Sequence, residues 1–358
     1  MKSASKIAAA LVGAGATAAI GTLAYARWVE RLRVDVRRMS AEVDSPGLPA
    51  AGLRILHLSD MHFTGEGQIE RWKIERTLAL LAGEEIDLLL VTGDLIHDDG
   101  GLPAALDLLA RLPQPRLGAF ACLGNHDYAA YSWLGPARVA WREAEPGREL
   151  HDASLRTFEM MTRIFRNDKL YLGQEHNDIE ILKRGLASQN VTVLDNSNVR
   201  ITTGGVDLWL AGVDDLMEGQ PDIDAALADA PEPESDALRI LLFHNPDHML
   251  DPRLQTFDLA FGGHVHGGQV LIPLLGALHT QGTHVSRRRT HGWFQYGETK
   301  TYIGRGLGEG VRLRFRCRPE VALIDVMPSD WDRLLPAESA SRPRAARNGK
   351  GAQLARAG

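Results

Sequence analysis

Five short apolar runs, each followed within three residues by Asp, Asn or His, constrain the fold of this chain more than any other feature. The runs cover residues 54–58, 86–91, 117–123, 239–243 and 259–261, and each is typical of a buried β-strand. Between the first two, residues 69–81 show the apolar spacing of an α-helix. A strand, a helix and a further strand in succession predict parallel pairing and therefore an α/β fold. The functional groups of such a sheet gather at the carboxyl ends of its strands.

The polar residues that follow these runs share one kind of chemistry, because all of them can donate oxygen or nitrogen to a cation. They are Asp60 and His62, Asp94, Asn125 and His126, His244, and His264 and His266. Taken singly, each is best explained as a turn residue or a helix cap. Together, their carboxylate, amide and imidazole donors suit Mn²⁺, Fe or Zn²⁺ and not an ion that prefers thiolate.

Cleavage of a phosphate ester explains why such a set would be useful. Two cations about 3.5–4 Å apart can activate one water and neutralise the oxygens of the phosphate, and a carboxylate is needed between them. In an extended segment, the alternation His264-Val265-His266 sends both imidazoles in one direction, so each could reach a different metal. The neighbouring glycines allow the backbone to approach closely.

At this point the residues resemble a known family. Five ordered blocks are similar to those of the calcineurin-like metallophosphoesterases: Asp60-Met61-His62, Gly93-Asp94, Gly124-Asn125-His126-Asp127, His244 and Gly263-His264-Val265-His266. The resemblance spans about Leu53 to Val326 and implies a four-layer α/β/β/α sandwich. It also implies roles for the eight residues. Asp60, His62 and His266 would bind one metal, Asn125, His244 and His264 the other, Asp94 would bridge them, and His126 would protonate the leaving oxygen.

Further segments narrow the resemblance to bacterial membrane-associated phosphodiesterases, which are similar to the UDP-2,3-diacylglucosamine hydrolases of lipid A synthesis. These segments are residues 264–270 with Pro273, residues 304–308, and residues 318–320. Arg305 and Arg312 are candidate phosphate contacts, although a structural role explains either arginine equally well.

One position departs from the family pattern. Many relatives have Asp three residues after the bridging Asp, where it can orient the catalytic His, but this chain has His97 followed by Asp98. Asp98 could take the role through a shifted loop, or Asp127 or a water could do so. We keep Arg305 and Asp98 as candidate substrate-binding residues.

The N-terminal segment differs in composition from the rest. An uncharged run from Ile7 to Ala26 has about the length that a helix needs to cross a bilayer. It predicts either a retained single-pass anchor in the cell membrane or a cleaved signal peptide, with Ala24-Tyr25-Ala26 as the cleavage site. The arginines from Arg27 to Arg38 would keep the main domain cytoplasmic if the segment is an anchor, whereas a signal peptide would place it outside.

These boundaries define the expected organisation of the 358 residues. We predict a membrane segment over 1–38, a linker over 39–51, a phosphoesterase domain over 52–328 with a helical insertion at about 130–185, and a disordered tail over 329–358. The aromatic residues of the insertion are Trp133, Trp141, Phe158 and Phe165. They could cover the acyl chain of a substrate, or they could only fill a core.

The composition excludes some classes of function. A formal net charge of -6 argues against a general nucleic-acid binder. Two cysteines, Cys122 and Cys317, give no disulfide framework and no CxxC metal site. The sequence therefore predicts a metal-dependent hydrolase of a phosphodiester or pyrophosphate, with an amphiphilic phosphate-ester substrate. The alternatives are a metal-stabilised binding module without chemistry, a general phosphodiesterase and a protein phosphatase. The sequence does not predict an oligomeric state.

Overall fold

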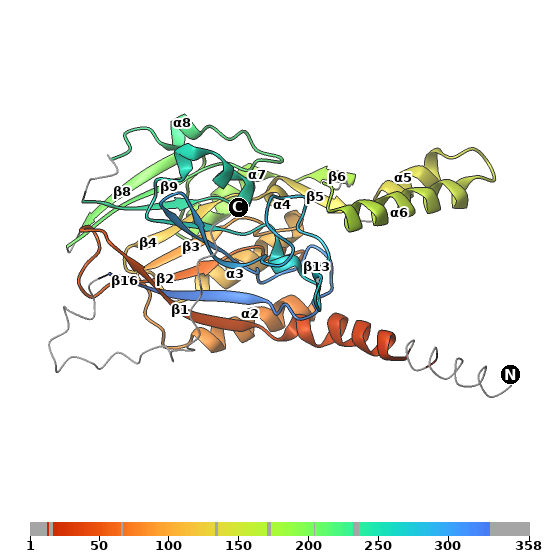
Figure 1. Cartoon of the computed structure of the whole chain (residues 1–358), viewed down its shortest axis with the longest axis horizontal. Helices are drawn as coiled ribbons and strands as arrows, with labels where there is room; N and C mark the ends of the chain where they lie inside the picture. The colour runs from red at the N-terminus through yellow and green to blue at the C-terminus, as the bar shows by residue number, and fades with distance from the viewer. Residues whose placement is uncertain are drawn as a thin grey trace.

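Two six-stranded sheets packed face to face form the centre of the computed structural model, which describes residues 13, 17–65, 67–132, 135–169, 173–203, 205–231 and 236–329 (Figure 1). The first sheet has the order β1-β16-β2-β3-β4-β7, in which β1 (Asp35–Val43) and β16 (Glu320–Pro328) are parallel to each other and antiparallel to the other four strands. The other four, which are parallel to one another, are β2 (Leu53–Leu58), β3 (Leu88–Thr92), β4 (Gly118–Cys122) and β7 (Val191–Val193). Every residue of β3 is buried, as expected for a central parallel strand covered on both faces.

The second sheet has the order β14-β15-β11-β10-β9-β8. Its four central strands are parallel and its two edge strands are antiparallel to their neighbours. The strands are β8 (Ser197–Thr203), β9 (Val206–Gly212), β10 (Leu238–Leu242), β11 (Leu259–Gly262), β14 (Gly292–Tyr296) and β15 (Thr299–Ile303).

Helical elements cover the outer faces of both sheets, so the molecule has four layers. The first sheet is covered by α2 (Gln68–Leu81), α3 (Leu102–Arg111) and α7 (Ile179–Ser188), which share one apolar cluster with it. The second is covered by α8 (Ile223–Ala226) and the 3₁₀ turns η3 (Pro246–Leu250) and η4 (Pro252–Leu254). A third cluster, which includes Leu90 and Phe261, lies between the sheets. These layers are the predicted mixed α/β sandwich.

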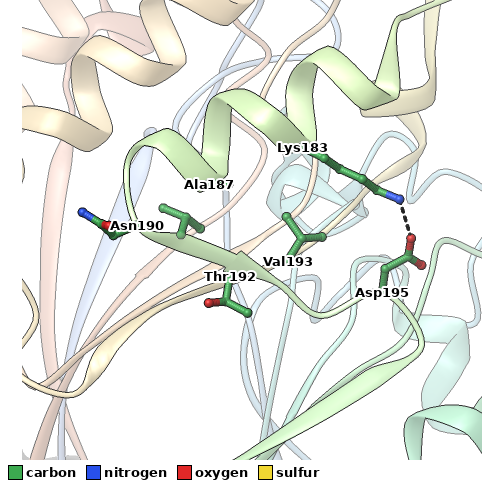
Figure 2. Close-up of a pocket in the computed structure, with 7 residues that line it drawn as sticks. Lys183, Ala187, Asn190, Thr192, Val193 and Asp195 are labelled. Atoms are coloured by element: carbon green, nitrogen blue, oxygen red, sulfur yellow. Dashed lines mark hydrogen bonds and ion pairs between the residues drawn. The ribbon is translucent and has the colours of Figure 1, made fainter.

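Several short elements lie within the loops that connect the strands. They are η2 (Asp99–Gly101), α4 (Asn125–Tyr128), η5 (His266–Gly268), β12 (Leu271–Ile272) and β13 (Gly276–Ala277). At the edge strand β7, α7 packs beside a hollow of about 570 Å³. Figure 2 shows Lys183 and Asp195 pointing toward each other there, with 2.7 Å between Nζ and Oδ2. The two charges of this hollow therefore satisfy each other.

A helical hairpin fills most of the predicted insertion. The ribbon of β5 (Ala129–Ser132) and β6 (Gly173–His176) leads into α5 (Gly135–Glu143) and α6 (Glu149–Arg166). The two helices extend well away from the sheets (Figure 1). No residue of α6 is buried, so this helix is not part of a core. Trp133 lies outside the described residues.

The N-terminal segment joins the domain earlier than predicted. A helix over residues 17–28 leads through η1 (Glu30–Leu32) into β1 (Asp35–Val43), which pairs in parallel with β16 (Glu320–Pro328) along its whole length. The predicted boundaries at residues 38 and 39 were therefore wrong, because this strand runs across them. Val36 and Val43 face inward while arginines occupy exposed or half-buried positions, so the charged residues hid the pattern of an edge strand.

The membrane segment and the tail are only partly covered by the structure. Among the described residues, no helix has the length and apolar character needed to cross a membrane. Of the predicted span from Ile7 to Ala26, residues 7–12 and 14–16 lie outside them. The predicted disordered tail falls outside them as well, except for Ser329.

Candidate metal centre

The seven predicted ligands lie in loops that leave the carboxyl ends of five strands. Strands β2, β3 and β4 of the first sheet carry Asp60, His62, Asp94 and Asn125, while β10 and β11 of the second carry His244, His264 and His266. All seven are buried. The two sheets therefore bring together residues that are up to 206 positions apart in the chain.

Four of these residues form a first group of donor atoms. Asp60, His62, Asp94 and His266 each place one donor atom within 4.8 Å of those of the others. His62 Nε2 lies 2.9 Å from His266 Nε2 and 3.2 Å from Asp94 Oδ2. His266 Nε2 lies 3.6 Å from Asp60 Oδ1. Imidazole nitrogens and carboxylate oxygens thus converge on one small volume.

A second group shares Asp94 with the first. Asp94 Oδ2 lies 3.2 Å from His244 Nε2, and His264 Nδ1 lies 3.3 Å from the same nitrogen. Asn125 Oδ1 lies 3.0 Å from His264 Nδ1 and completes the set. The structure therefore places Asp94 between two groups of the composition that the resemblance implies.

The chemistry of the converging donors tests whether these groups fit metal ions. They are carboxylate oxygens of Asp60 and Asp94, the amide oxygen of Asn125 and imidazole nitrogens, and all of these residues are buried. This mixture of oxygen and nitrogen donors fits two divalent cations. The other polar atoms of four ligands, Asp60 Oδ2, His62 Nδ1, His264 Nε2 and His266 Nδ1, are buried without a hydrogen-bond partner, which costs about 1–3 kcal/mol for each group.

The backbone at the site is strained in a repeated way. Asp60, His62, Asp94, His264 and His266 have φ values of 50°, 48°, 54°, 71° and 49°. L-residues rarely adopt this left-handed region, and such strain persists only where surrounding contacts enforce it. Here the N–H groups of Asp60 and His62 donate to the carbonyls of Gly93 and Asp94, both at 3.0 Å. The strain turns the donor side chains inward.

Two positions at this site have room only for glycine, because neighbouring atoms lie too close for a Cβ. A Cβ at Gly93 would lie 2.6 Å from Gly124 N and His244 Nδ1, and one at Gly263 would lie 2.5 Å from Asp60 Oδ2. Gly93 also has a φ of 76°. A side chain at either position would push a metal ligand out of place.

Asp127 braces the loops that carry the ligands. Its carboxylate accepts hydrogen bonds from the N–H groups of Asp94 and Leu95 at 2.8 Å and of Gly124 at 2.9 Å. It therefore fastens the loop after β3 to the loop after β4. These contacts show that Asp127 supports the backbone, and they favour this role over the orientation of His126, which was one of the alternatives left open by the sequence.

His126 lies next to the shared carboxylate and contacts His97. The backbone N–H of His126 donates to Asp94 Oδ1 at 2.8 Å, and its ring Nδ1 lies 3.0 Å from His97 Nδ1. Asp98 instead caps η2 by accepting from Gly100 N. His97, at the position that departs from the family pattern, is thus the side chain that contacts the His126 ring nitrogen.

Burial and neighbouring charge set the protonation of the site. Burial lowers the pKa of His264 to about 3 and that of His97 to about 4, and it lowers the pKa of His266 and His126 well below the ordinary value. Burial also opposes ionisation of Asp94, but His244 and other nearby imidazoles hold its pKa well below the usual range. The neutral imidazoles keep a lone pair available for a cation.

Two cavities adjoin the centre. One, of about 40 Å³, is lined by Asp94, Asn125, His126, Tyr131, Met217, His264, His266 and Gln281. The other, of about 210 Å³, includes His62 and His97 in its wall. Tyr131, Met217 and Gln281 were not identified from the sequence, because none of them follows an apolar run.

Arg305 lies between two carboxylates. Its Nε pairs with Glu320, and its Nη2 lies 3.4 Å from Asp35 Oδ2. Two carboxylates from β16 and β1 therefore hold the guanidinium, and these contacts favour the structural role that was weighed for it.

Comparison with known proteins agrees with this geometry. A family model described as calcineurin-like phosphoesterase matches residues 53–268. The uncharacterised metallophosphoesterase YkuE of Bacillus subtilis is 29% identical over 321 residues, covering 87% of this chain and 92% of that protein. Phosphodiesterase YaeI of Escherichia coli is 29% identical over 280 residues, covering 78% of this chain and 83% of that protein. The UDP-2,3-diacylglucosamine pyrophosphatase LpxG of Chlamydia trachomatis is 28% identical over 342 residues, covering 87% of this chain and 98% of that protein.

Proposed function

Since this chain belongs to the calcineurin-like phosphoesterase family, we propose that it hydrolyses a phosphodiester or pyrophosphate bond of an amphiphilic substrate at a membrane surface. The family makes it a hydrolase of phosphoric esters that uses two divalent metal ions. The observation that carries the proposal is the pair of donor groups that share Asp94, with His126 beside them.

Each residue of the centre has a role in this reaction. Asp60, His62 and His266 would hold one ion, Asn125, His244 and His264 the other, and Asp94 both. When bound, the ions supply Lewis-acid chemistry that activates water and neutralises phosphate oxygens. His126 would donate a proton to the leaving oxygen, and His97 would hold the His126 ring in position through its Nδ1 contact.

Exposed apolar side chains support an amphiphilic substrate. Along α6, Leu150, Phe158, Met161 and Phe165 are 74%, 68%, 44% and 61% exposed, and their spacing places them on one stripe of the helix. Folding gives no reason to expose such a stripe, because the apolar face of a helix is normally buried. A lipid or an acyl chain would cover it.

The base of the hairpin lies beside the metal centre. Asn167, which follows α6 directly, donates from Nδ2 to Thr280 Oγ1 at 2.8 Å. Gln281, the residue after Thr280, lines the smaller cavity. At the other end of the hairpin, Tyr131 in β5 lines the same cavity. A substrate that contacted α6 with its apolar part would therefore have its phosphate close to the ligands.

The N-terminal helix supports a membrane location. Over residues 17–28 it exposes Ile20, Leu23 and Trp28, and it leaves the same end of the molecule as the α5–α6 hairpin (Figure 1). We propose that the run from Ile7 to Ala26 is a single-pass anchor in the cell membrane. Mass spectrometry of the protein from isolated membranes tests this, since a protein that had lost a signal peptide would begin at Arg27.

The relatives suggest which substrate to test first. One relative acts, by its name, on UDP-2,3-diacylglucosamine, and another is named a phosphodiesterase. We propose that the substrate is UDP-2,3-diacylglucosamine or a compound with the same combination of acyl chains and pyrophosphate.

Hydrolysis by the metal-loaded full chain in detergent tests the proposal. The assay compares UDP-2,3-diacylglucosamine, its deacylated form and bis(p-nitrophenyl) phosphate. Because each buried methylene contributes about 0.8 kcal/mol, kcat/KM should be at least about tenfold higher for the acylated form. Equal values for both forms would indicate a general phosphodiesterase. No turnover of any of the three by protein with two bound ions would indicate a binding module.

A further inference from the structure

The larger cavity at the metal centre is lined by an excess of positive charge. Its volume is about 210 Å³, and its wall includes His62 and His97. Four cationic side chains, Arg27, Arg31, Lys73 and Arg312, line it together with only two carboxylates, Glu70 and Glu309. The arginines come from two segments almost 300 residues apart, so the folded chain creates this charge.

Both carboxylates are already engaged by the protein. Glu309 contacts three cations, with Lys73 Nζ at 2.5 Å, Arg31 Nη2 at 3.0 Å and Arg314 Nε at 3.5 Å. Glu70 Oε1 accepts hydrogen bonds from the N–H and the hydroxyl of Thr64 at 2.9 and 2.8 Å. The cavity therefore keeps a net positive potential.

Arg31 shows that an acceptor is missing. This side chain is buried, with 5% of the residue exposed, yet its Nε and Nη1 have no hydrogen-bond partner. A buried guanidinium with unsatisfied donors is costly unless a second anion completes its contacts. Nearby, Arg27 Nη1 donates to the carbonyl of Arg312 at 3.2 Å, which joins the Arg27 side chain to the second segment. Burial lowers the pKa of Arg27, and the charges of Arg31 and Arg312 lower it further.

We propose that this cavity binds a second phosphoryl group of the substrate, next to the one that is cleaved at the metal centre. The inference rests on the proposed function and specifies its substrate class, a diester of pyrophosphate in preference to a simple phosphodiester. Guanidinium groups suit phosphate because their planar N–H donors can bind two oxygens at once. His62 and His97 place the cavity in contact with the site where the bond breaks.

The N-terminal segment is then part of the substrate site as well as a tether. Arg27 lies in the helix over residues 17–28, and Arg31 lies in η1, which leads into β1. A helix held at a membrane surface would present these two arginines to the head group of a substrate in the same membrane.

Two substrates that differ in phosphate number test the inference with the full metal-loaded chain. P1,P2-di(uridine-5′) diphosphate carries two phosphoryl groups, and bis(p-nitrophenyl) phosphate carries one. The variants are Arg27→Gln and Arg312→Gln, with Arg312→Lys to restore the charge. The matched control is Arg33→Gln, because Arg33 is exposed and does not line the cavity.

We expect the ratio of kcat/KM for the diphosphate to that for the monophosphate to fall about tenfold in each glutamine variant, as for a lost hydrogen bond to a charged group. The fall should come mainly from KM, Arg312→Lys should recover part of it, and Arg33→Gln should leave the ratio unchanged. An unchanged ratio in both glutamine variants would overturn the inference, as would an equal fall in the control.

A binding measurement separates this inference from the proposed function. Isothermal titration with α,β-methylene-UDP needs no turnover, and its Kd should rise in Arg27→Gln and not in Arg33→Gln. Failure of the wild-type chain to hydrolyse both P1,P2-di(uridine-5′) diphosphate and bis(p-nitrophenyl) phosphate would count against the proposed function. An equal Kd in the wild type and Arg27→Gln would count against the second phosphate site alone.

Discussion

The metal centre and the α5–α6 hairpin adjoin each other, yet each places residues where folding alone would not. At the centre, seven polar side chains are buried, and four of their atoms have no partner. On α6, large apolar side chains are exposed and no residue is buried. Both arrangements agree with the proposal that a ligand completes each region, a cation at the centre and an apolar group on the hairpin.

The largest effect should follow from removing the shared carboxylate. Asp94→Asn is expected to lose both metals and to reduce kcat by about a thousandfold or more, since metals supply several kcal/mol of charge stabilisation. Elemental analysis should find close to two ions per chain in the wild type. Asp107→Asn, in the exposed part of α3, serves as the control. Full activity in Asp94→Asn would refute the assignment of the centre.

Deletions should separate the two regions by their effect on folding. Removal of residues 1–51 deletes β1 and exposes the edge of β16, so we expect loss of the cooperative thermal transition. Replacement of residues 135–166 by a short Gly-Ser linker should leave the melting temperature almost unchanged, because no side chain of α6 is buried. A stable product of the first deletion would make β1 dispensable and restore the predicted start of the domain at Gly52.

The next effect concerns the proton donor. His126→Ala is expected to keep its metals and to lower kcat about a hundredfold, as for the loss of a general acid. Loss of metal from this variant, measured by elemental analysis, would instead make His126 a ligand.

His97 should act only through His126. His97→Ala is expected to lower kcat by about tenfold alone and to have little further effect in the His126→Ala background, because coupled residues are not additive. The double-mutant cycle, measured with bis(p-nitrophenyl) phosphate, reports this coupling. Additive losses would show that His97 has a separate role.

The metal ligands could be predicted from the sequence, whereas the contacts between loops could not, and the reason is physical. Each ligand follows an apolar run, so the end of a strand and the start of the site are visible together, as at Val91 and Asp94. Contacts between loops have no such signal. The pairing of His97 with His126, and of Arg31 with Glu309 across 278 residues, depends on how loops close over the finished sheets.

The N-terminal boundary shows a different failure. Arg37 and Arg38 made residues 27–38 look like the charged flank of a membrane segment. In the structure they lie on an edge strand, where Val36 belongs to the core cluster under the helices and Val43 to the cluster between the sheets. Several other residues of this strand are exposed or half-buried, so its composition can match that of a linker.

The apolar stripe of the hairpin should affect lipid substrates and not the fold. The double variant Phe158→Ser/Phe165→Ser is expected to lower kcat/KM for UDP-2,3-diacylglucosamine about tenfold, since burying one Phe is worth about 1.5–3 kcal/mol. Hydrolysis of bis(p-nitrophenyl) phosphate and the melting temperature should stay at the wild-type level. Arg156→Ser/Glu159→Ser, on the charged face of the same helix, is the matched control. A drop in melting temperature of several degrees would show that the stripe is part of a core after all.

The smallest effect on activity is expected at His57, which tests whether a buried polar side chain by itself marks function. His57 is buried between the sheets, but its Nε2 lies 2.8 Å from Thr92 Oγ1, and its ring contacts Phe261 and Tyr302. His57 Nε2 therefore has the hydrogen-bond partner that four side-chain atoms of the metal ligands lack. His57→Gln should keep a hydrogen bond to Thr92 and should leave kcat at pH 7 within about twofold, as usual away from the reacting groups.

The same residue should make the protein sensitive to acid. Burial lowers the pKa of His57 to about 4, despite the opposing charge of Glu320, whereas the unfolded value is about 6.5. Between these values the unfolded state binds the proton and the folded state does not, so stability is lost as pH falls from 6.5 toward 4. At pH 5 the loss is about 2 kcal/mol.

The glutamine variant lacks this contribution to the pH dependence, while the other buried histidines titrate equally in both proteins. Urea denaturation at pH 7 and pH 5 should therefore show a smaller fall in the variant by about that amount. An identical fall in both proteins would mean that His57 is protonated in the folded state, and then its burial would need a functional explanation like that of the ligands.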